Sequence, residues 1–230
     1  MNRLRVVCGF LFAGLVFGSA MAMQEPTERD AVPRGFRMYL ISDGRIAEDA
    51  KKKANPDKKA PSKDESIHYR VGKLHDPVTE HGLATVLGVF VRSIPTEEAD
   101  PILKVLKFQQ DLAKKYRPER LGAFMAFLSL EKDFADDDTR YARMDEIKKL
   151  SDAAIIPYVQ TGLAEGKLAD GSVPPQVAAW QVGAEDAITF VLFHRFKIIK
   201  RWSFKSDALP TDADLEAIAA EVSKVVGKVR

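Results

Sequence analysis

Two histidines and two carboxylates lie within one seven-residue stretch, which makes this stretch a candidate metal site. It runs from His75 to His81 and includes Asp76 and Glu80. Imidazole nitrogens and carboxylate oxygens bind zinc and copper, but a structural zinc site takes about four ligands, and neither of the other two histidines has a recognisable ligand spacing. We therefore predict no metal or other cofactor and interpret the stretch as a polar loop leading into a strand. Metal binding through His75 and His81 is the alternative.

The single cysteine, Cys8, lies inside an apolar run over residues 6–17. Arg3 and Arg5 precede this run and small residues follow it over 18–22, a pattern typical of a secretory signal peptide with cleavage after Ala22. An uncleaved membrane anchor is the alternative, although the run is shorter than the roughly 20 apolar residues of a stable span. We expect a periplasmic or secreted mature chain that starts at Met23, lacks stable membrane insertion and contains no cysteine. Dithiol chemistry, thiol peroxidase chemistry and thiolate zinc sites are then excluded.

The charge balance gives no global argument for an anionic partner. The chain has 35 Lys+Arg and 33 Asp+Glu, and loss of Arg3 and Arg5 with the signal makes the mature chain formally neutral. We therefore predict no nucleic-acid partner. Residues 48–66 contain six lysines and almost no apolar residue, but acidic residues interrupt the positive charge. We interpret this segment as a solvated lysine-rich loop, with docking to an anionic envelope surface as a less favoured alternative.

The rest of the mature chain is predicted to be a flexible leader over 23–35 and a single domain over 36–230. A short strand is expected over 36–42. Two continuous apolar runs, over 84–92 and 122–130, are typical of strands buried on both faces. Asp100 and Pro101 can begin a helix after the first of these strands, and an acidic cluster at 136–138 can cap a helix after the second. Two such strands joined through a helix are expected to pair in parallel.

The second half of the chain begins with a region punctuated by Gly and Pro over 162–175 and a short helix over 176–181. Two strands then follow over 187–193 and 197–204, too close for a crossover, so they predict an antiparallel hairpin. The last element is an amphipathic helix capped by Thr211 or Asp212. The tryptophans Trp180 and Trp202 are interpreted as core or rim residues.

This order of elements over 84–230 resembles a thioredoxin-like or peroxiredoxin-like domain. The resemblance implies an α/β three-layer sandwich, a mixed sheet flanked by helices, with a redox site after the strand 84–92 at the start of the next helix. Residues 93–101 stand there and contain no cysteine. Ile94-Pro95-Thr96-Glu97 is similar to the Cys-Pro-Thr-Glu of some peroxiredoxins, with isoleucine in place of the nucleophile. The position of the family's cis-proline, near Ile188, also lacks a proline.

These observations predict a redox-inactive binding or structural module with no catalytic residue, and they do not identify its partner. An exposed apolar patch around Ile94 and Ile188 would favour the binding of a peptide, as in the substrate groove of redox-active relatives. No hydrolase, phosphate-loop or zinc-protease motif occurs in the sequence. The candidate binding face comprises Ser93, Ile94, Thr96, Glu97 and Ile188.

Overall fold

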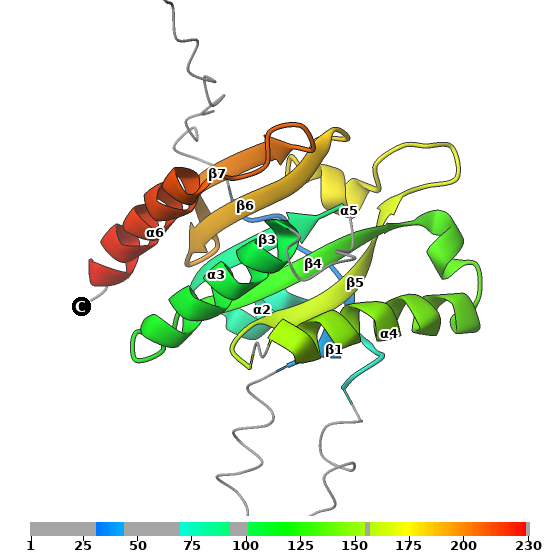
Figure 1. Cartoon of the computed structure of the whole chain (residues 1–230), viewed down its shortest axis with the longest axis horizontal. Helices are drawn as coiled ribbons and strands as arrows, with labels where there is room; N and C mark the ends of the chain where they lie inside the picture. Colours follow the sequence, from blue (N-terminus) through cyan, green and yellow to red (C-terminus); the bar gives the residue numbers. More distant parts are fainter. Residues whose placement is uncertain (1–30, 44–69, 93–100, 155–156, 229–230) are drawn as a thin grey trace, which may run out of the picture.

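Two buried parallel strands form the centre of the structure. The computed structural model describes residues 31–43, 70–92, 101–154 and 157–228. The centre consists of β3 (Thr85–Val91) and β4 (Gly122–Leu130), which pair in parallel as their continuous apolar runs predict. They belong to a seven-stranded sheet of order β2-β1-β5-β4-β3-β6-β7 (Figure 1). The other strands are β1 (Met38–Ser42), β2 (Leu74–His75), β5 (Gln160–Lys167), β6 (Asp186–His194) and β7 (Lys197–Lys205).

Side chains alternate between the two faces of the sheet because successive residues of a strand point to opposite sides. In β3, Leu87 and Val89 belong to one hydrophobic cluster, whereas Val86 and Phe90 belong to the other. The second cluster is rich in packed aromatic rings, with the Phe90 and Trp180 ring centroids 5.3 Å apart. Each face of the sheet therefore has its own core and needs its own covering layer.

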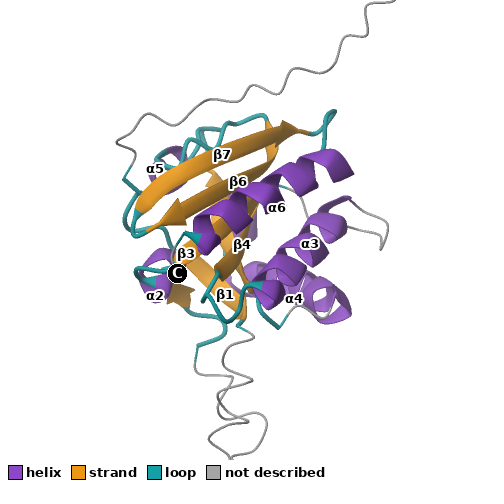
Figure 2. Cartoon of the chain, turned by 90° about the vertical axis from the view of Figure 1, so that its left-hand side faces the viewer, coloured by secondary structure: helices purple, strands orange, loops and turns teal. Residues whose placement is uncertain are grey.

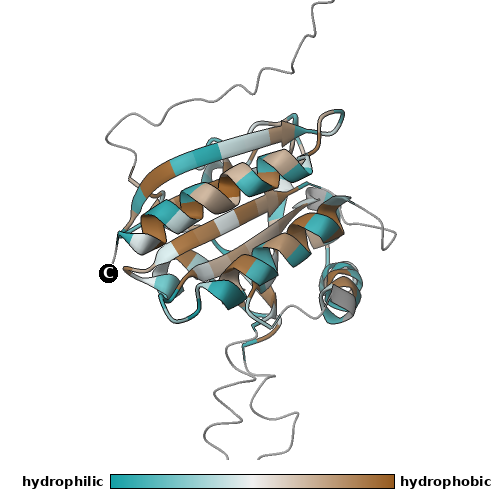
Figure 3. Ribbon diagram, turned by 60° about the vertical axis from the view of Figure 1, so that its left-hand side comes forward, coloured by the Kyte–Doolittle hydropathy of each residue, from teal (hydrophilic) through white to brown (hydrophobic). Residues whose placement is uncertain are grey.

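Helices cover both faces, as the two cores require (Figure 2). One face carries α3 (Pro101–Lys115), α4 (Asp137–Ala154) and α6 (Asp212–Gly227), and the other carries α2 (Pro77–His81) and α5 (Pro175–Ala178). The helix that ends at the C label in Figure 3 shows alternating hydrophobic and hydrophilic bands, as expected for a helix with one face on a sheet. No helix of the described ranges is long and apolar enough to span a bilayer.

The topology confirms the expected thioredoxin-like α/β fold. The strands β3 and β4 are parallel and joined through α3, β6 runs antiparallel to β3, and β7 completes a hairpin with β6. The terminal helix α6 starts at the predicted cap, where Thr211 and Asp214 form a reciprocal capping box. Asp136 caps α4 by accepting a hydrogen bond of 2.7 Å from the Thr139 N–H. Trp180 and Trp202 are buried, as predicted.

One buried amide links α3 to the two central strands. The Nε2 of Gln109 donates to the backbone oxygen of Leu87 at 2.7 Å and to that of Phe124 at 2.8 Å. Gln109 is fully buried. The helix is therefore attached to β3 and β4 by polar contacts as well as by apolar packing.

The prediction for residues 162–175 is wrong in its first part. Instead of a connection, the strand β5 lies between β1 and β4 and pairs in parallel with β4. The glycines that suggested a connection make room for neighbouring side chains. A Cβ on Gly162 would lie 2.6 Å from Met38 Cγ, and a Cβ on Gly166 would lie 2.6 Å from Leu128 Cβ.

The polar stretch before β3 also contains more structure than expected. Instead of a loop, residues 74–81 form the edge strand β2 and the one-turn helix α2. The side chain of Asp76 caps the N-terminus of α2 by accepting hydrogen bonds from the Val78 and Thr79 N–H groups. At the N-terminal end of the described chain, Val32 is buried and its N–H donates to Phe196 O at 2.9 Å. Residues 31–35 of the predicted leader thus belong to the packed domain. The predicted signal peptide and the lysine-rich loop lie outside the described residues.

Candidate functional site

The two ends of the central strands offer two candidate sites. The first is the end of β3, where the resemblance implies a redox site between Val91 and the start of α3 at Pro101. Ser93, Ile94, Thr96 and Glu97 lie outside the described residues. Ile188 does not belong to an exposed face, which corrects the prediction: it is fully buried and pairs with Val91 and Phe204. Its side chain points into the core beneath the helices, because that is the face its position in β6 presents.

Arg92 braces this end of the sheet. Its Nε and Nη2 donate to Gly183 O at 3.1 and 2.9 Å, and its Nη1 donates to Gly166 O at 3.1 Å. Burial lowers the pKa of the Arg92 guanidinium, and Asp186 and Glu185 act in the opposite direction. The Arg92 guanidinium thus links the ends of β3 and β5 to the segment before β6, which is a structural role. No motif in the sequence marks this arginine.

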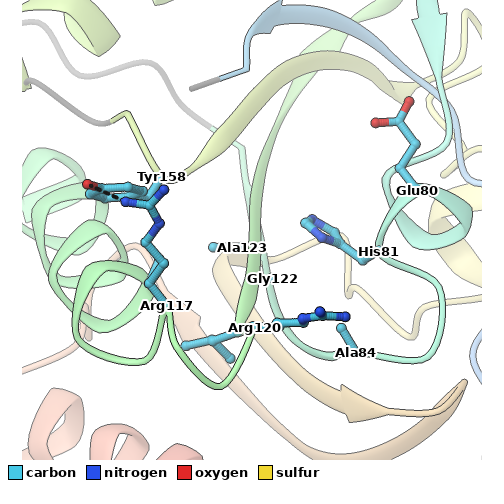
Figure 4. Close-up of a pocket in the computed structure, with 10 residues that line it drawn as sticks. Glu80, His81, Ala84, Arg117, Arg120, Gly122, Ala123 and Tyr158 are labelled. Carbon is cyan, nitrogen blue, oxygen red and sulfur yellow. Dashed lines mark hydrogen bonds between the residues drawn. The ribbon is translucent and has the colours of Figure 1, made fainter. Parts of the chain in front are cut away.

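The second candidate site is a cavity at the opposite end of the sheet, where β3 and β4 begin (Figure 4). Its volume is about 350 Å³. The walls come from the end of α2, the residue before β3, the end of α3, the turn after α3, the start of β4 and the segment before β5. They are formed by Glu80, His81, Ala84, Ala113, Arg117, Arg120, Leu121, Gly122, Ala123 and Tyr158.

Two arginines of the turn between α3 and β4 extend to different sides of the cavity. Figure 4 shows Arg120 reaching toward His81 and Ala84, whereas Arg117 reaches toward Tyr158. The Arg117 guanidinium carbon lies 5.2 Å from the centroid of the Tyr158 ring, within cation–π range. The cavity therefore has a cationic group on each side and the start of β4 between them.

His81 packs against the backbone at the first residue of β4. A Cβ on Gly122 would lie 2.5 Å from His81 Nδ1, so only glycine allows this approach. His75, the other histidine of the predicted candidate metal group, has different surroundings. Its Nδ1 lies 2.6 Å from Glu80 Oε1 and its Nε2 lies 3.1 Å from Arg70 O. Within the described ranges no group of three or more His, Cys, Asp or Glu could hold a metal ion.

Glu80 connects the cavity to a polar cluster. Its carboxylate pairs with Arg70 and His75, and it accepts a hydrogen bond of 2.7 Å from Gln160 Nε2. Burial alone would raise the pKa of Glu80, but the hydrogen bonds from Arg70, His75 and Gln160 outweigh burial and lower the pKa to about 2. The carboxylate is therefore ionised at neutral pH, and its charge is compensated within the protein.

The cavity could not be predicted from the sequence because its residues come from separate segments of the chain. Arg117 and Arg120 flank Pro118 and Glu119 in a polar turn that has no motif and could be any solvated connection. The backbone conformation of Arg120, with a φ of 59°, is not visible in the sequence. Tyr158 precedes a strand that the sequence analysis did not predict. Only the proximity of Glu80 and His81 to each other was available as a signal.

Comparison with known proteins gives structural neighbours of low sequence identity. No family model and no curated protein matches this chain. A candidate protein disulfide isomerase from Bacteroides thetaiotaomicron is 12% identical with a TM-score of 0.47, over 86% of this chain and 89% of that one. Peroxidoxin BcpB from Mycobacterium tuberculosis is 14% identical with a TM-score of 0.44, over 69% and 88%.

A secreted Mycobacterium tuberculosis disulfide oxidoreductase homologous to Escherichia coli DsbE is a further neighbour. It is 9% identical with a TM-score of 0.42, over 66% of this chain and 90% of that one. The strand order and helix placement described above define the fold of this chain: it is thioredoxin-like, with a cavity at the end of the sheet opposite the expected redox position.

Proposed function

We propose that this protein is a redox-inactive thioredoxin-like binding protein. The observation that carries the proposal is the absence of cysteine from residues 9–230, which include the whole connection from β3 to α3. Thiol–disulfide exchange and peroxide reduction at this position need a thiolate nucleophile.

The binding site of this protein is the cavity at the beginning of β3 and β4. Its volume of about 350 Å³ is within the range of small-molecule sites. It combines apolar walls with a few charged groups, which is the usual composition of a ligand pocket. The protein acts outside the cytoplasm, a proposal that the basic, apolar and small-residue segments of residues 1–22 support.

Thiol assays test the redox part of the proposal. We expect residues 23–230 to leave the rates of insulin-disulfide reduction and of peroxide consumption at their uncatalysed values, with a dithiol thioredoxin as positive control. Turnover by this cysteine-free chain that disappears when one residue of the 93–98 segment is substituted would contradict the proposal. Such a result would require a nucleophile other than a thiol.

A cavity-filling variant tests the binding part. In a small-molecule screen followed by amide NMR, we expect ligands to shift the resonances of Gly122 and Tyr158. The variant Ala84→Phe, which extends a ring from the rim of the cavity, should remove these shifts and retain the fold. Ligand-induced shifts that instead surround Arg92 and survive in Ala84→Phe would place the binding site at the other end of the sheet.

A further inference from the structure

We propose that the end of the sheet where β3 and β4 begin docks onto an anionic lipid bilayer, with Leu83 and Phe196 as the side chains that enter the bilayer surface. This inference is independent of any ligand in the cavity, because it concerns the exterior of the molecule. Four large apolar side chains are exposed among the described residues. Two of them are Leu83, which is 65% exposed, and Phe196, which is 39% exposed, and the others are Leu74 and Tyr141.

The pairing of β3 with β6 brings the turns that carry Leu83 and Phe196 together. Thr85 of β3 pairs with His194 of β6, and Thr85 Oγ1 lies 2.9 Å from His194 Nδ1. Leu83 lies two residues before Thr85, and Phe196 lies two residues after His194. Because the two strands are antiparallel, both turns lie beyond the same end of the sheet. The two exposed apolar side chains therefore belong to neighbouring turns.

The backbone at Phe196 indicates that this residue is retained for a reason other than the geometry of its turn. Arg195 and Phe196 form the two-residue connection between β6 and β7, with φ values of 50° and 60°. Asparagine and glycine suit such positions in a hairpin turn, whereas a positive φ is unfavourable for a bulky residue. Unfavourable backbone conformations are typical of functional sites. The exposed part of the Phe196 ring is available to a partner.

Cationic side chains accompany the two turns. Arg195 and Lys197 lie on either side of Phe196 in the sequence, and both are exposed. Arg120, which precedes β4, is also exposed and reaches toward Ala84 at the start of β3 (Figure 4). Lysine and arginine side chains near a membrane surface bind the phosphates of anionic lipids. The charges at this end thus complement such a surface.

The carboxylates nearby do not cancel this positive charge. Glu119 is the single carboxylate in the α2–β3, α3–β4 and β6–β7 connections. Glu80, at the end of α2, is already paired within the protein. The guanidinium of Arg117 is directed to Tyr158 and does not contribute to the proposed surface. Cations outnumber carboxylates at this end even without it.

The arrangement of the two apolar side chains favours a bilayer over a protein partner. A stable protein interface buries roughly 800 Å² on each partner, which is more than two turn residues provide. The interfacial region of a bilayer instead accepts single aromatic and aliphatic side chains, and adjacent cations strengthen the contact. Binding of this kind is peripheral and requires no membrane-spanning segment.

Vesicle flotation with residues 23–230 tests the proposal. One set of vesicles contains phosphatidylglycerol and phosphatidylcholine in equal amounts, and the other contains phosphatidylcholine alone. We expect binding to the anionic vesicles to be about tenfold tighter and this preference to disappear at high salt. Equal binding to both sets, or no binding to either, would overturn the proposal. Binding to polyglutamate without binding to the anionic vesicles would identify an acidic protein as the partner instead.

Two double variants form a matched pair for the apolar contact. Leu83→Ser/Phe196→Asn removes both proposed side chains, and asparagine tolerates the positive φ, so this variant should fold and bind the anionic vesicles about tenfold more weakly. Leu74→Ser/Tyr141→Asn removes the other exposed leucine and aromatic ring, on β2 and α4, and should bind as the wild type does. Equal affinities of the two variants would exclude Leu83 and Phe196 as the docking residues.

Two lysines at opposite ends of β7 test the charge. Lys197→Gln, at the start of the strand, should weaken binding to the anionic vesicles about fivefold. Lys205→Gln is the control, because this lysine is also exposed but lies at the far end of the strand, and it should have no effect. Equal losses in the two variants would show that the position of the charge is unimportant and would contradict the proposed surface.

A fluorescent label distinguishes docking through this end from any other contact with vesicles. Residues 9–230 contain no cysteine, so an introduced thiol takes the label alone. With an environment-sensitive fluorophore on Leu83→Cys, we expect a shift of the emission to shorter wavelength when anionic vesicles are added. The same label on Leu74→Cys should not shift. A shift at position 74 only would place the membrane contact on the opposite edge of the sheet and overturn the proposal.

Discussion

The guanidinium of Arg70 donates to Asp43 Oδ2 at 3.1 Å and so joins two positions that are 27 residues apart in the chain. The Asp43 side chain is only 2% exposed, and the same oxygen accepts from Gln160 Nε2 at 3.3 Å. Asp43 directly follows β1, and Arg70 lies in the turn before β2. The pair therefore holds these two positions together at the edge of the sheet.

Removal of one partner of this pair should be costly. In Arg70→Met the nearly buried carboxylate of Asp43 and the carboxylate of Glu80 both lose the Arg70 guanidinium, and we expect the free energy of unfolding to fall by about 3 kcal/mol. The double variant Arg70→Met/Asp43→Leu should recover the part of this loss that comes from Asp43, because only Glu80, which keeps its contacts with His75 and Gln160, then lacks the guanidinium. Urea unfolding monitored by tryptophan fluorescence measures both changes. A single variant as stable as the wild type would show that solvent compensates the charge.

Glu80 should make the free energy of unfolding decrease as the pH falls through the acidic range. Its pKa is about 2 in the folded protein and near 4.5 in the unfolded chain, so its stabilising contribution is complete above about pH 4.5 and is lost as the pH falls toward 2. We expect Glu80→Gln to lower the free energy of unfolding by about 2 kcal/mol at pH 7 and much less at pH 2. Glu216→Gln, an exposed position on α6, is the control and should change neither value appreciably. Parallel urea curves at the two pH values test the difference.

Arg92 should not be replaceable by lysine. Its fork reaches Gly166 O and Gly183 O together, and a single ammonium group cannot reproduce that geometry. We expect Arg92→Lys to lower the free energy of unfolding by about 2 kcal/mol. In contrast, Arg37→Lys changes an exposed side chain and should have an effect below about 0.5 kcal/mol. Equal melting temperatures of the two variants would argue against a bracing role for Arg92.

The glycine at position 166 should be essential for the packing of β5. An added Cβ would lie 2.6 Å from Leu128 Cβ and 3.1 Å from its Cα, so the neighbouring backbone would have to move. We expect Gly166→Ala to destabilise the protein by about 2 kcal/mol through this overpacking. Gly227→Ala is the matched control because nothing lies within 4 Å of its added Cβ. Thermal unfolding should show a lower melting temperature for the first variant only.

The elements that could be predicted are those whose own residues or connection length determine their structure. The strands β3 and β4 are continuous apolar runs, and the β6–β7 hairpin has too short a connection for any other pairing. The strand β5 could not be predicted, because Gly162 and Gly166 break its apolar pattern. These glycines are needed because side chains of the neighbouring strands β1 and β4 approach closely. Their small size matters only once Met38 and Leu128 are in place.

The candidate site was less predictable than the fold, because proximity in space decides it. His75 and His81 are close in sequence, yet one bonds Glu80 and the other packs on Gly122. Conversely, Arg120 and His81 are far apart in sequence and line the same cavity. Ile188 was assigned to a surface from its position in the family pattern, whereas the pairing of β6 buries it.

The hydrogen bonds of Gln109 discriminate between possible registers of the strands β3 and β4. A slip of β3 against β4 by one residue would take at least one acceptor, Leu87 O or Phe124 O, away from its amide. An unsatisfied amide in the core costs on the order of 1–3 kcal/mol, while the apolar side chains nearby would tolerate many arrangements. The two hydrogen bonds of this buried amide therefore favour the native register of β3 and β4 over a shifted one.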